Sequence, residues 1–100
     1  MNQPIIEEAI LKKRLVEFTY SNHRREVEPH ILGVSNGVLQ LLGYQVGGSS
    51  SSGKPLPEWR RFDLNKITQL TISERTFLGP RPYPSGKHSP WDYQISVVKS

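Results

Sequence analysis

The sequence predicts a small, mainly β domain: a five-stranded antiparallel barrel of the SH3 or Sm-like kind, preceded by one short α-helix. Its length of 100 residues suits one domain with one hydrophobic core. Apolar residues recur at helical spacing near the N-terminus, and short alternating runs separated by turn residues follow. Closing such a sheet into a barrel would remove the strand edges that otherwise invite aggregation.

The helix is expected over residues 4–13. Pro4 suits a first helical position, because its missing N–H would have had no partner there. Acidic residues come early in this segment and basic residues come late, as the helix dipole favours. The apolar residues that recur at helical spacing are Ile5, Ile6, Ala9 and Ile10.

Three strands should follow the helix. The first, residues 15–20, alternates apolar and polar side chains. The second, residues 25–34, contains Pro29, which has no N–H to give to a central ladder and therefore indicates a bend or a sheet edge. Both residues of Asn36–Gly37 tolerate positive φ, so they predict a type I′ hairpin turn into a third, antiparallel strand over residues 38–46.

The second half of the barrel begins after a loop. Residues 47–57 contain four consecutive serines between glycines and prolines, without apolar periodicity. Strand patterns return at residues 59–64 and 67–72, joined by a tight turn at Asn65–Lys66. These two segments complete the five expected strands.

The chain divides into a barrel domain with its helix, residues 1–78, and a C-terminal extension, residues 79–100. Four of the eight prolines and four of the nine aromatic residues fall from Phe77 onward. Because disordered tails are usually poor in aromatic residues, we expect Phe77, Trp91 and Tyr93 to pack along the barrel, with the proline-rich part running extended between them.

Composition limits the classes of partner. Thirteen Lys and Arg against nine Asp and Glu give a formal net charge of +4, which favours an anionic partner. The chain has no cysteine, so it holds no disulfide and no thiolate metal site. No apolar run approaches the roughly 20 residues of a membrane helix and no signal segment is recognisable, so we expect a cytoplasmic protein without membrane contact.

No arrangement typical of an active site is recognisable. The three histidines, His23, His30 and His88, lack metal-ligand spacing. The serines lack nucleophile-elbow surroundings, and no glycine-rich phosphate loop precedes a helix. We therefore expect no catalysis, no metal and no cofactor.

Several pieces of the chain, spread over residues 5–78, occur in a familiar order and spacing. They are the helix with Ala9 and Ile10, the strand Val16–Tyr20, the segment Arg25–Pro29 with His30 and Leu32 after it, Asn36–Gly37 leading to Gly43–Tyr44, the run Trp59–Ile67, and Phe77. In this order they resemble the WYL domain, an Sm-like barrel module found mostly in bacterial transcriptional regulators. The resemblance implies ligand sensing on a basic groove, with single-stranded nucleic acid or nucleotide-like molecules as candidate ligands.

Two departures from the family pattern concern the expected site. The tripeptide that names the family falls on Leu39–Leu41, where its Trp and Tyr are absent. The closing strand of the family resembles Arg-x-Phe-Arg-Leu-Asp-Arg-Ile, but Asp63 stands at its second basic position and Lys66 at its third. A negative charge therefore replaces a positive one inside the expected site.

The site residues that the resemblance implies are Tyr20, Arg25, Tyr44, Arg60 and Lys66. Arginine can hold a phosphate in two places, lysine adds a point charge, and tyrosine offers a stacking face and a hydroxyl. Arg61 is adjacent to Arg60 on a strand and must point to the opposite face. A purely structural interpretation is also open: the tyrosines bury their rings at strand ends, and Arg25 pairs with Glu28 or Asp63.

We therefore expect a stand-alone, non-catalytic module that senses an anionic ligand, a single-stranded nucleic acid or a nucleotide, in a regulatory role. The alternative, from a different class, is a protein-interaction or self-association barrel, a homodimer included. In that alternative the basic excess is incidental, and no nucleic acid is bound.

Overall fold

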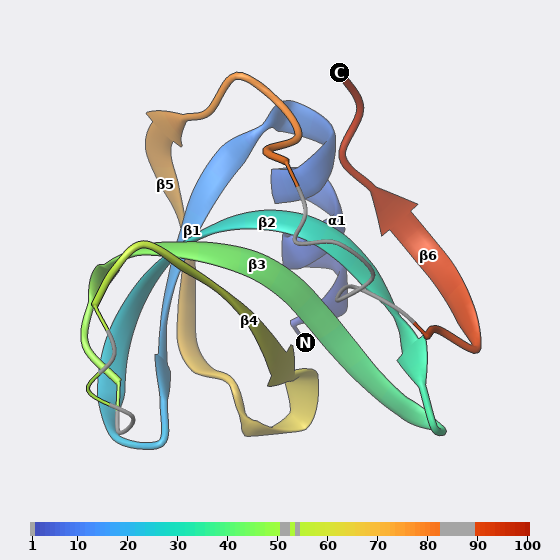
Figure 1. Cartoon of the computed structure of the whole chain (residues 1–100), viewed down its shortest axis with the longest axis horizontal. Coiled ribbons are helices and arrows are strands. Elements are labelled where there is room, and N and C mark those ends of the chain that lie inside the picture. The colour runs from blue at the N-terminus through green and yellow to red at the C-terminus, as the bar shows by residue number, and fades with distance from the viewer. Residues whose placement is uncertain (1, 51–52, 54, 83–89) are drawn as a thin grey trace.

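The computed structural model describes residues 2–50, 53, 55–82 and 90–100. Within these ranges the chain forms one α-helix, six β-strands and one short 3-10 helix (Figure 1). In chain order the elements are α1 (Gln3–Lys12), β1 (Arg14–Tyr20), β2 (His23–Ser35), β3 (Val38–Gly48), β4 (Glu58–Asp63), η1 (Leu64–Lys66), β5 (Thr68–Thr76) and β6 (Tyr93–Val97). The prediction of a mainly β domain with an N-terminal helix is confirmed. No helix in the described ranges is long and apolar enough to cross a membrane.

All the strands belong to one antiparallel sheet built around β2 (Figure 1). The strand order is β4-β3-β2-β1-β5, and β6 is a further partner of β2. β3 occupies one edge of β2, so β1 and β6 share the other edge: β1 pairs with residues 23–27 and β6 with residues 31–34. Pro29 falls between these two ladders, where its missing N–H interrupts neither. Pro29 thus lies in a central strand and not at a sheet edge: it pairs with Gly43 of β3, and the register of that ladder shifts between Pro29 and Ile31.

The sheet curls but does not close into a barrel, so the expected closure is wrong. In the described part of the chain no ladder joins β4 to β5, which stand at the two ends of the strand order. Although β4 and β5 are consecutive in the chain, joined by η1, β4 pairs with β3 and β5 with β1, on opposite sides of β2. The ladder between β5 and β1 contains two register shifts, and such irregularities bend a strand.

The core lies between α1 and the curled sheet. α1 buries Ile6, Ala9 and Ile10, three of the residues whose spacing predicted the helix, and it contacts β1, β2, β5 and β6. Burying a large aliphatic side chain stabilises the fold by roughly 1.5 to 3 kcal/mol. The other core residues are Leu15, Val16, Phe18, Val27, Leu32, Leu41, Phe62, Leu64, Ile67, Phe77 and Val98.

Two tight turns set the register of the first three strands. Asn36 and Gly37 take φ values of 50° and 77°, both positive as a type I′ turn requires, and connect β2 to β3 as predicted. Ser21 and Asn22 take φ values of 51° and 63° and connect β1 to β2. Because a two-residue loop fixes which residues lie opposite each other, these turns also decide which side chains face the core.

The C-terminal extension contains a strand that the sequence analysis does not predict. β6 adds residues 93–97 to the sheet, and the alternation of Tyr, Ile and Val with Gln and Ser is the signal for it. Phe77 is buried in the core, and Trp91 packs so closely on Gly33 that an added Cβ would come within 2.8 Å of the indole ring. Tyr93, expected to pack in the same way, is 60% exposed.

Candidate ligand-binding site

Arg25, one of the expected site residues, lies buried inside the curled sheet and is only 1% exposed. Its Nη1 donates to Oε1 of Gln45 at 3.2 Å, and its Nη2 donates to the backbone carbonyl of Tyr20 at 2.9 Å. The guanidinium carbon lies 5.6 Å from the ring centroid of Tyr20 and 5.7 Å from that of Phe62. Two aromatic rings and two neutral oxygen acceptors therefore hold this cation.

The positive charge of Arg25 has no carboxylate partner. Among the residues that the structure describes, no Asp or Glu forms an ion pair with it, and its buried Nε has no acceptor. Burial lowers the pKa of Arg25, and the charge of Arg60 lowers it further. A buried donor without an acceptor costs about 1 to 3 kcal/mol, which offsets part of the stability that the packing and hydrogen bonds of Arg25 contribute.

Arg60 extends from β4 toward the same region. Its Nη1 forms an ion pair with Oε2 of Glu58 at 2.8 Å, and its side chain is 24% exposed. Its charge acts on Arg25: burial is the larger cause of the lowered pKa of Arg25, and the positive charge of Arg60 is the second. Two guanidinium groups against one carboxylate leave one positive charge in excess. Arg61 points to the other face, as expected, where its guanidinium lies 4.0 Å from the ring centroid of Trp91.

Lys66 is connected to Tyr20 through Asp63. Nζ of Lys66 lies 3.6 Å from Oδ2 of Asp63, whose Oδ1 accepts from Nε2 of Gln40 at 2.8 Å. The backbone N–H of Asp63 donates to the hydroxyl of Tyr20 at 3.1 Å. Asp63 thus orients the exposed lysine. We term Tyr20, Arg25, Arg60 and Lys66 the basic cluster: hydrogen bonds and an ion pair connect Tyr20 to Arg25 and, through Asp63, to Lys66, and the charge of Arg60 acts on Arg25.

The structure separates Tyr44 from the basic cluster. Gln45, which binds Arg25, points into the curled sheet, so Tyr44, its neighbour, points to the opposite face of β3. There its ring lies 5.1 Å from that of Trp59, and the guanidinium of Arg81 lies 4.7 Å from its centroid. The five expected site residues therefore lie on two faces of the sheet.

Arg81, which the sequence analysis does not single out, is held on this opposite face. Its Nε and Nη2 donate to the two carboxylate oxygens of Glu28 at 2.6 and 2.9 Å. Its backbone N–H donates to Nε2 of His30 at 3.2 Å, so Nδ1 of His30 carries the hydrogen and donates to the carbonyl of Glu28 at 2.8 Å. Glu28, His30 and Arg81 are termed the Arg81 anchor, because they fasten the segment after Phe77 to β2.

Protonation of His30 is opposed in this setting. The ring is fully buried, stacked on Phe77 at 5.4 Å between centroids and edge-on to Trp59 at 4.7 Å. Burial lowers the pKa of His30, although the backbone hydrogen bond to Glu28 acts in the other direction. The neutral ring is therefore the form that the anchor requires, since Nε2 must accept a hydrogen bond.

The sequence leaves open that Arg25 pairs with Glu28 or Asp63, and the structure shows neither pair. Glu28 is committed to Arg81, and Asp63 to Lys66 and Gln40. No local pattern could have shown this, because Arg81 is 53 residues from Glu28 in the chain. Arg25 is therefore buried without a carboxylate among the described residues because of contacts that form only in the folded chain.

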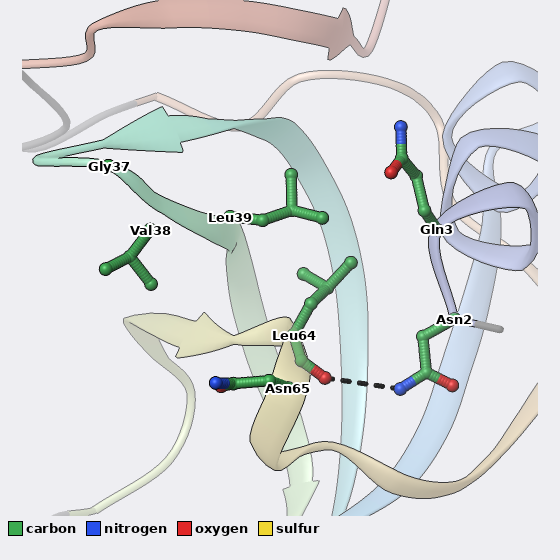
Figure 2. Close-up of a pocket in the computed structure, with 7 residues that line it drawn as sticks. All are labelled: Asn2, Gln3, Gly37, Val38, Leu39, Leu64 and Asn65. Atoms are coloured by element: carbon green, nitrogen blue, oxygen red, sulfur yellow. Dashed lines mark hydrogen bonds between the residues drawn. The ribbon is translucent and has the colours of Figure 1, made fainter.

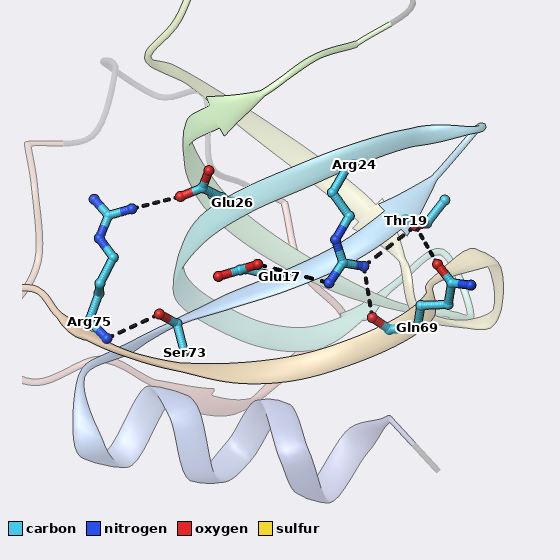
Figure 3. A network of polar contacts seen from close by, with 7 residues as sticks. All are labelled: Glu17, Thr19, Arg24, Glu26, Gln69, Ser73 and Arg75. Atoms are coloured by element: carbon cyan, nitrogen blue, oxygen red, sulfur yellow. Dashed lines mark hydrogen bonds and ion pairs between the residues drawn. The ribbon is translucent and has the colours of Figure 1, made fainter.

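Two other arginines, Arg24 on β2 and Arg75 on β5, pair with acidic residues on the outer surface (Figure 3). Arg24 lies 3.9 Å from a carboxylate oxygen of Glu17 and donates to the carbonyl of Gln69 at 2.9 Å. Arg75 forms an ion pair with Glu26 at 2.6 Å. Exposed pairs of this kind contribute about 0 to 1 kcal/mol each and leave no local excess of positive charge.

The structure also contains an uncharged hollow that no residue of the basic cluster lines. A hollow of about 480 Å³ lies between the start of α1, the β2–β3 hairpin and η1 (Figure 2). Leu39 and Leu64 form its apolar part, the carboxamides of Gln3 and Asn65 its polar part, and no charged residue of the described ranges lines it. No three His, Asp or Glu residues of those ranges gather as metal ligands, and His88 lies outside them.

Comparison with known proteins gives two matches. A family model described as the WYL domain matches residues 3–72. Among solved structures, the chain is similar to proteasome accessory factor B/C (PafBC) of Arthrobacter aurescens, with a TM-score of 0.63 and 23% sequence identity. That similarity covers 86% of this chain and 14% of the PafBC chain, so this chain spans only a small part of that protein. No curated protein matches the chain.

Proposed function

The chain belongs to the WYL domain family, and from this membership we propose that it is a regulatory, non-catalytic module that senses an anionic ligand through the basic cluster. One observation carries the proposal. Arg60 is close enough for its charge to act on Arg25, and among the described residues Glu58 is the carboxylate that forms an ion pair with either arginine. On the outer surface, by contrast, Arg24 is paired with Glu17 and Arg75 with Glu26.

Each member of the basic cluster has a distinct part in this proposal. Arg60 and Lys66 reach solvent, so they would contact the ligand, Arg60 with its planar fork and Lys66 with a point charge. Arg25 is buried, so it would act through its field, which is weakly screened in low-dielectric surroundings. Tyr20 would position Arg25 and, through Asp63, Lys66. Tyr44 has no part in this site, because it faces the Arg81 anchor.

The ligand class we propose is a single-stranded nucleic acid or a nucleotide. Such molecules carry phosphates for the cations, and a flexible strand can follow a curved surface that a stiff duplex cannot. A site with about three neutralised phosphates would bind a single strand with a salt slope near −2.

The test is a titration of the full chain into a fluorescently labelled, mixed-sequence single-stranded oligonucleotide at increasing salt. We expect the affinity to fall with salt and Arg60→Ala and Lys66→Ala each to weaken binding by about tenfold at low salt. Arg25 is left intact in this test, because its removal also disturbs the core.

Arg75→Ala is the matched control. It removes an exposed arginine that is paired with Glu26 and lies outside the basic cluster, so binding should be unchanged. Salt-insensitive binding, or an equal loss in the control, would contradict the proposal.

A further inference from the structure

β6 leaves one of its two edges without a partner strand. It pairs with residues 31–34 of β2, and no other strand within the described ranges pairs with it. The backbone N–H of Val98 donates to the carbonyl of His30 at 2.8 Å. Because successive backbone groups of a strand point to alternate sides, the N–H and C=O of Val97 point away from β2. Such an edge offers donors and acceptors to an extended chain beside it.

The open edges of the sheet differ in how well they are protected. β4 has the sequence Glu-Trp-Arg-Arg-Phe-Asp, with four charged residues in six. β5 is bent by two register shifts and exposes Glu74 and Arg75. Charged side chains and bulges discourage the addition of another strand. β6, with the sequence Tyr-Gln-Ile-Ser-Val, has neither a charge nor a proline, so it is the edge best suited to accept one.

An apolar groove lies between β6 and the end of α1. Its volume is about 480 Å³. The residues that line it include Ile10, Leu11 and Lys13 from the helix and its cap, and Ile95, Val97 and Lys99 from β6 and its end. Leu11, Ile95 and Val97 are all exposed, so an incoming chain would find aliphatic side chains beside the free backbone edge.

The charges beside the groove specify its partner. Lys13 and Lys99 both line it, and none of the described residues that line it is acidic. Neither lysine forms an ion pair with a described residue. A chain with Asp or Glu next to its apolar residues would complement both lysines. The β6 strand of a second copy has no acidic residue between Tyr93 and Val97, so it lacks this complement.

We propose that the free edge of β6 and this groove bind an extended, acidic segment of a partner protein, which adds a strand to the sheet. Backbone hydrogen bonds to β6 would supply affinity, and the apolar groove with its two lysines would supply selectivity. The surface uses no residue of the basic cluster, so ligand binding and partner binding can be tested independently.

The probe is a short, labelled peptide of alternating valine and glutamate, compared with its valine–lysine counterpart by fluorescence anisotropy on the full chain. We expect a preference of about tenfold for the glutamate peptide, from two exposed charge pairs. Amide chemical-shift changes should concentrate on β6 and the end of α1. The charge reversal Lys13→Glu with Lys99→Glu should invert the preference toward the lysine peptide.

Two further variants keep the test decisive. Val97→Pro removes an outward N–H and should abolish binding of the glutamate peptide, with the fold checked by its NMR spectrum. Lys12→Gln, a charge change next to Lys13 at a position outside the groove lining, should leave binding unchanged.

The proposal is overturned by equal binding of the two peptides, by shift changes at β4 or β5 instead of β6, or by a preference that the charge reversal does not move. It is equally overturned if the chain dimerises through β6 without peptide, seen by light scattering and by the same amide shifts, because the occupant is then a second copy.

Discussion

Arg25, a residue of the central strand, and Arg81, which binds that strand through Glu28, lie on its two faces, and the structure holds them differently. Arg81 meets both carboxylate oxygens of Glu28, and that hydrogen bonding raises its pKa. Arg25 meets only neutral oxygens and aromatic rings, and burial lowers its pKa. A matched arginine neutralises its surroundings and fastens one segment to another. An unmatched one leaves a positive field, and that field is the property an anionic ligand requires.

The two arginines also differ in their exposure to solvent. Arg81 is half exposed while its partner Glu28 is buried, so the pair mainly stabilises a buried carboxylate. At Arg25 the cation itself is buried, so its desolvation offsets part of the stability from its packing, and in the function proposed above its charge serves ligand binding. Substitutions on either face should therefore separate stability from ligand affinity.

The largest effect is expected from Arg25→Ala. The substitution empties space between Tyr20 and Phe62 and leaves the buried Oε1 of Gln45 without its donor. The free energy of unfolding should fall by about 3 kcal/mol, as measured by urea denaturation. Arg24→Ala changes the exposed neighbour on the same strand and should cost less than about 0.5 kcal/mol. Equal losses in the two variants would contradict the expectation that the buried arginine contributes more to stability than its exposed neighbour.

A smaller loss is expected from Glu28→Gln, which weakens the Arg81 anchor without changing side-chain size. Because Glu28 is buried but Arg81 is half exposed, we expect a loss of about 1 to 2 kcal/mol in the free energy of unfolding. Glu26→Gln is the matched control, since Glu26 also pairs with an arginine, Arg75, but at the surface. Its cost should stay below about 1 kcal/mol. An equal loss in the free energy of unfolding for Glu26→Gln and Glu28→Gln would show that burial of the carboxylate adds nothing to the pair.

The smallest effect is a pH dependence that originates at His30. Because burial opposes protonation, the pKa of His30 in the folded state lies below the usual value of about 6.5 for histidine. The unfolded chain therefore binds the proton first as pH falls, so the contribution of His30 to stability is complete above about pH 6.5 and is lost as pH falls toward the folded pKa. The groups that face the ring are Glu28, Arg81, Trp59 and Phe77.

Thermal unfolding midpoints measured between about pH 7.5 and pH 5.5 would show this slope. His30→Gln should flatten it. His23→Gln, at a partly exposed position bonded to Ser49, should keep it. A slope that survives in the His30 variant would assign the effect to another group.

The sequence predicts the parts of this fold that depend on neighbours in the chain. The helix follows from the spacing of Ile6, Ala9 and Ile10, and the hairpin follows from the positive φ that Asn36–Gly37 can adopt. Closure of the sheet depends on whether distant strands meet, and no local pattern reports that. The same limit hid the pairing of β6 with the second half of β2.

In the candidate site, too, the sequence indicates which residues matter but not how distant residues meet. The family pattern points to Arg25 and Arg60, and their assignment as ligand-binding residues stays a prediction. Tyr44 lies elsewhere because a shift of one position along a strand reverses the face that a side chain occupies. The absence of a carboxylate beside Arg25, among the residues described, follows from the distant partner that Glu28 finds in Arg81.

Pro29 divides β2 into two lengths, one paired with β1 and the other with β6. The ladder to β1 ends at Val27, and the ladder to β6 begins at Ile31. A change in the terminal strand, in its length, sequence or direction, would therefore leave the register around Arg25 undisturbed. One proline in a central strand thus separates the ladder beside Arg25 from the ladder that carries the terminal strand.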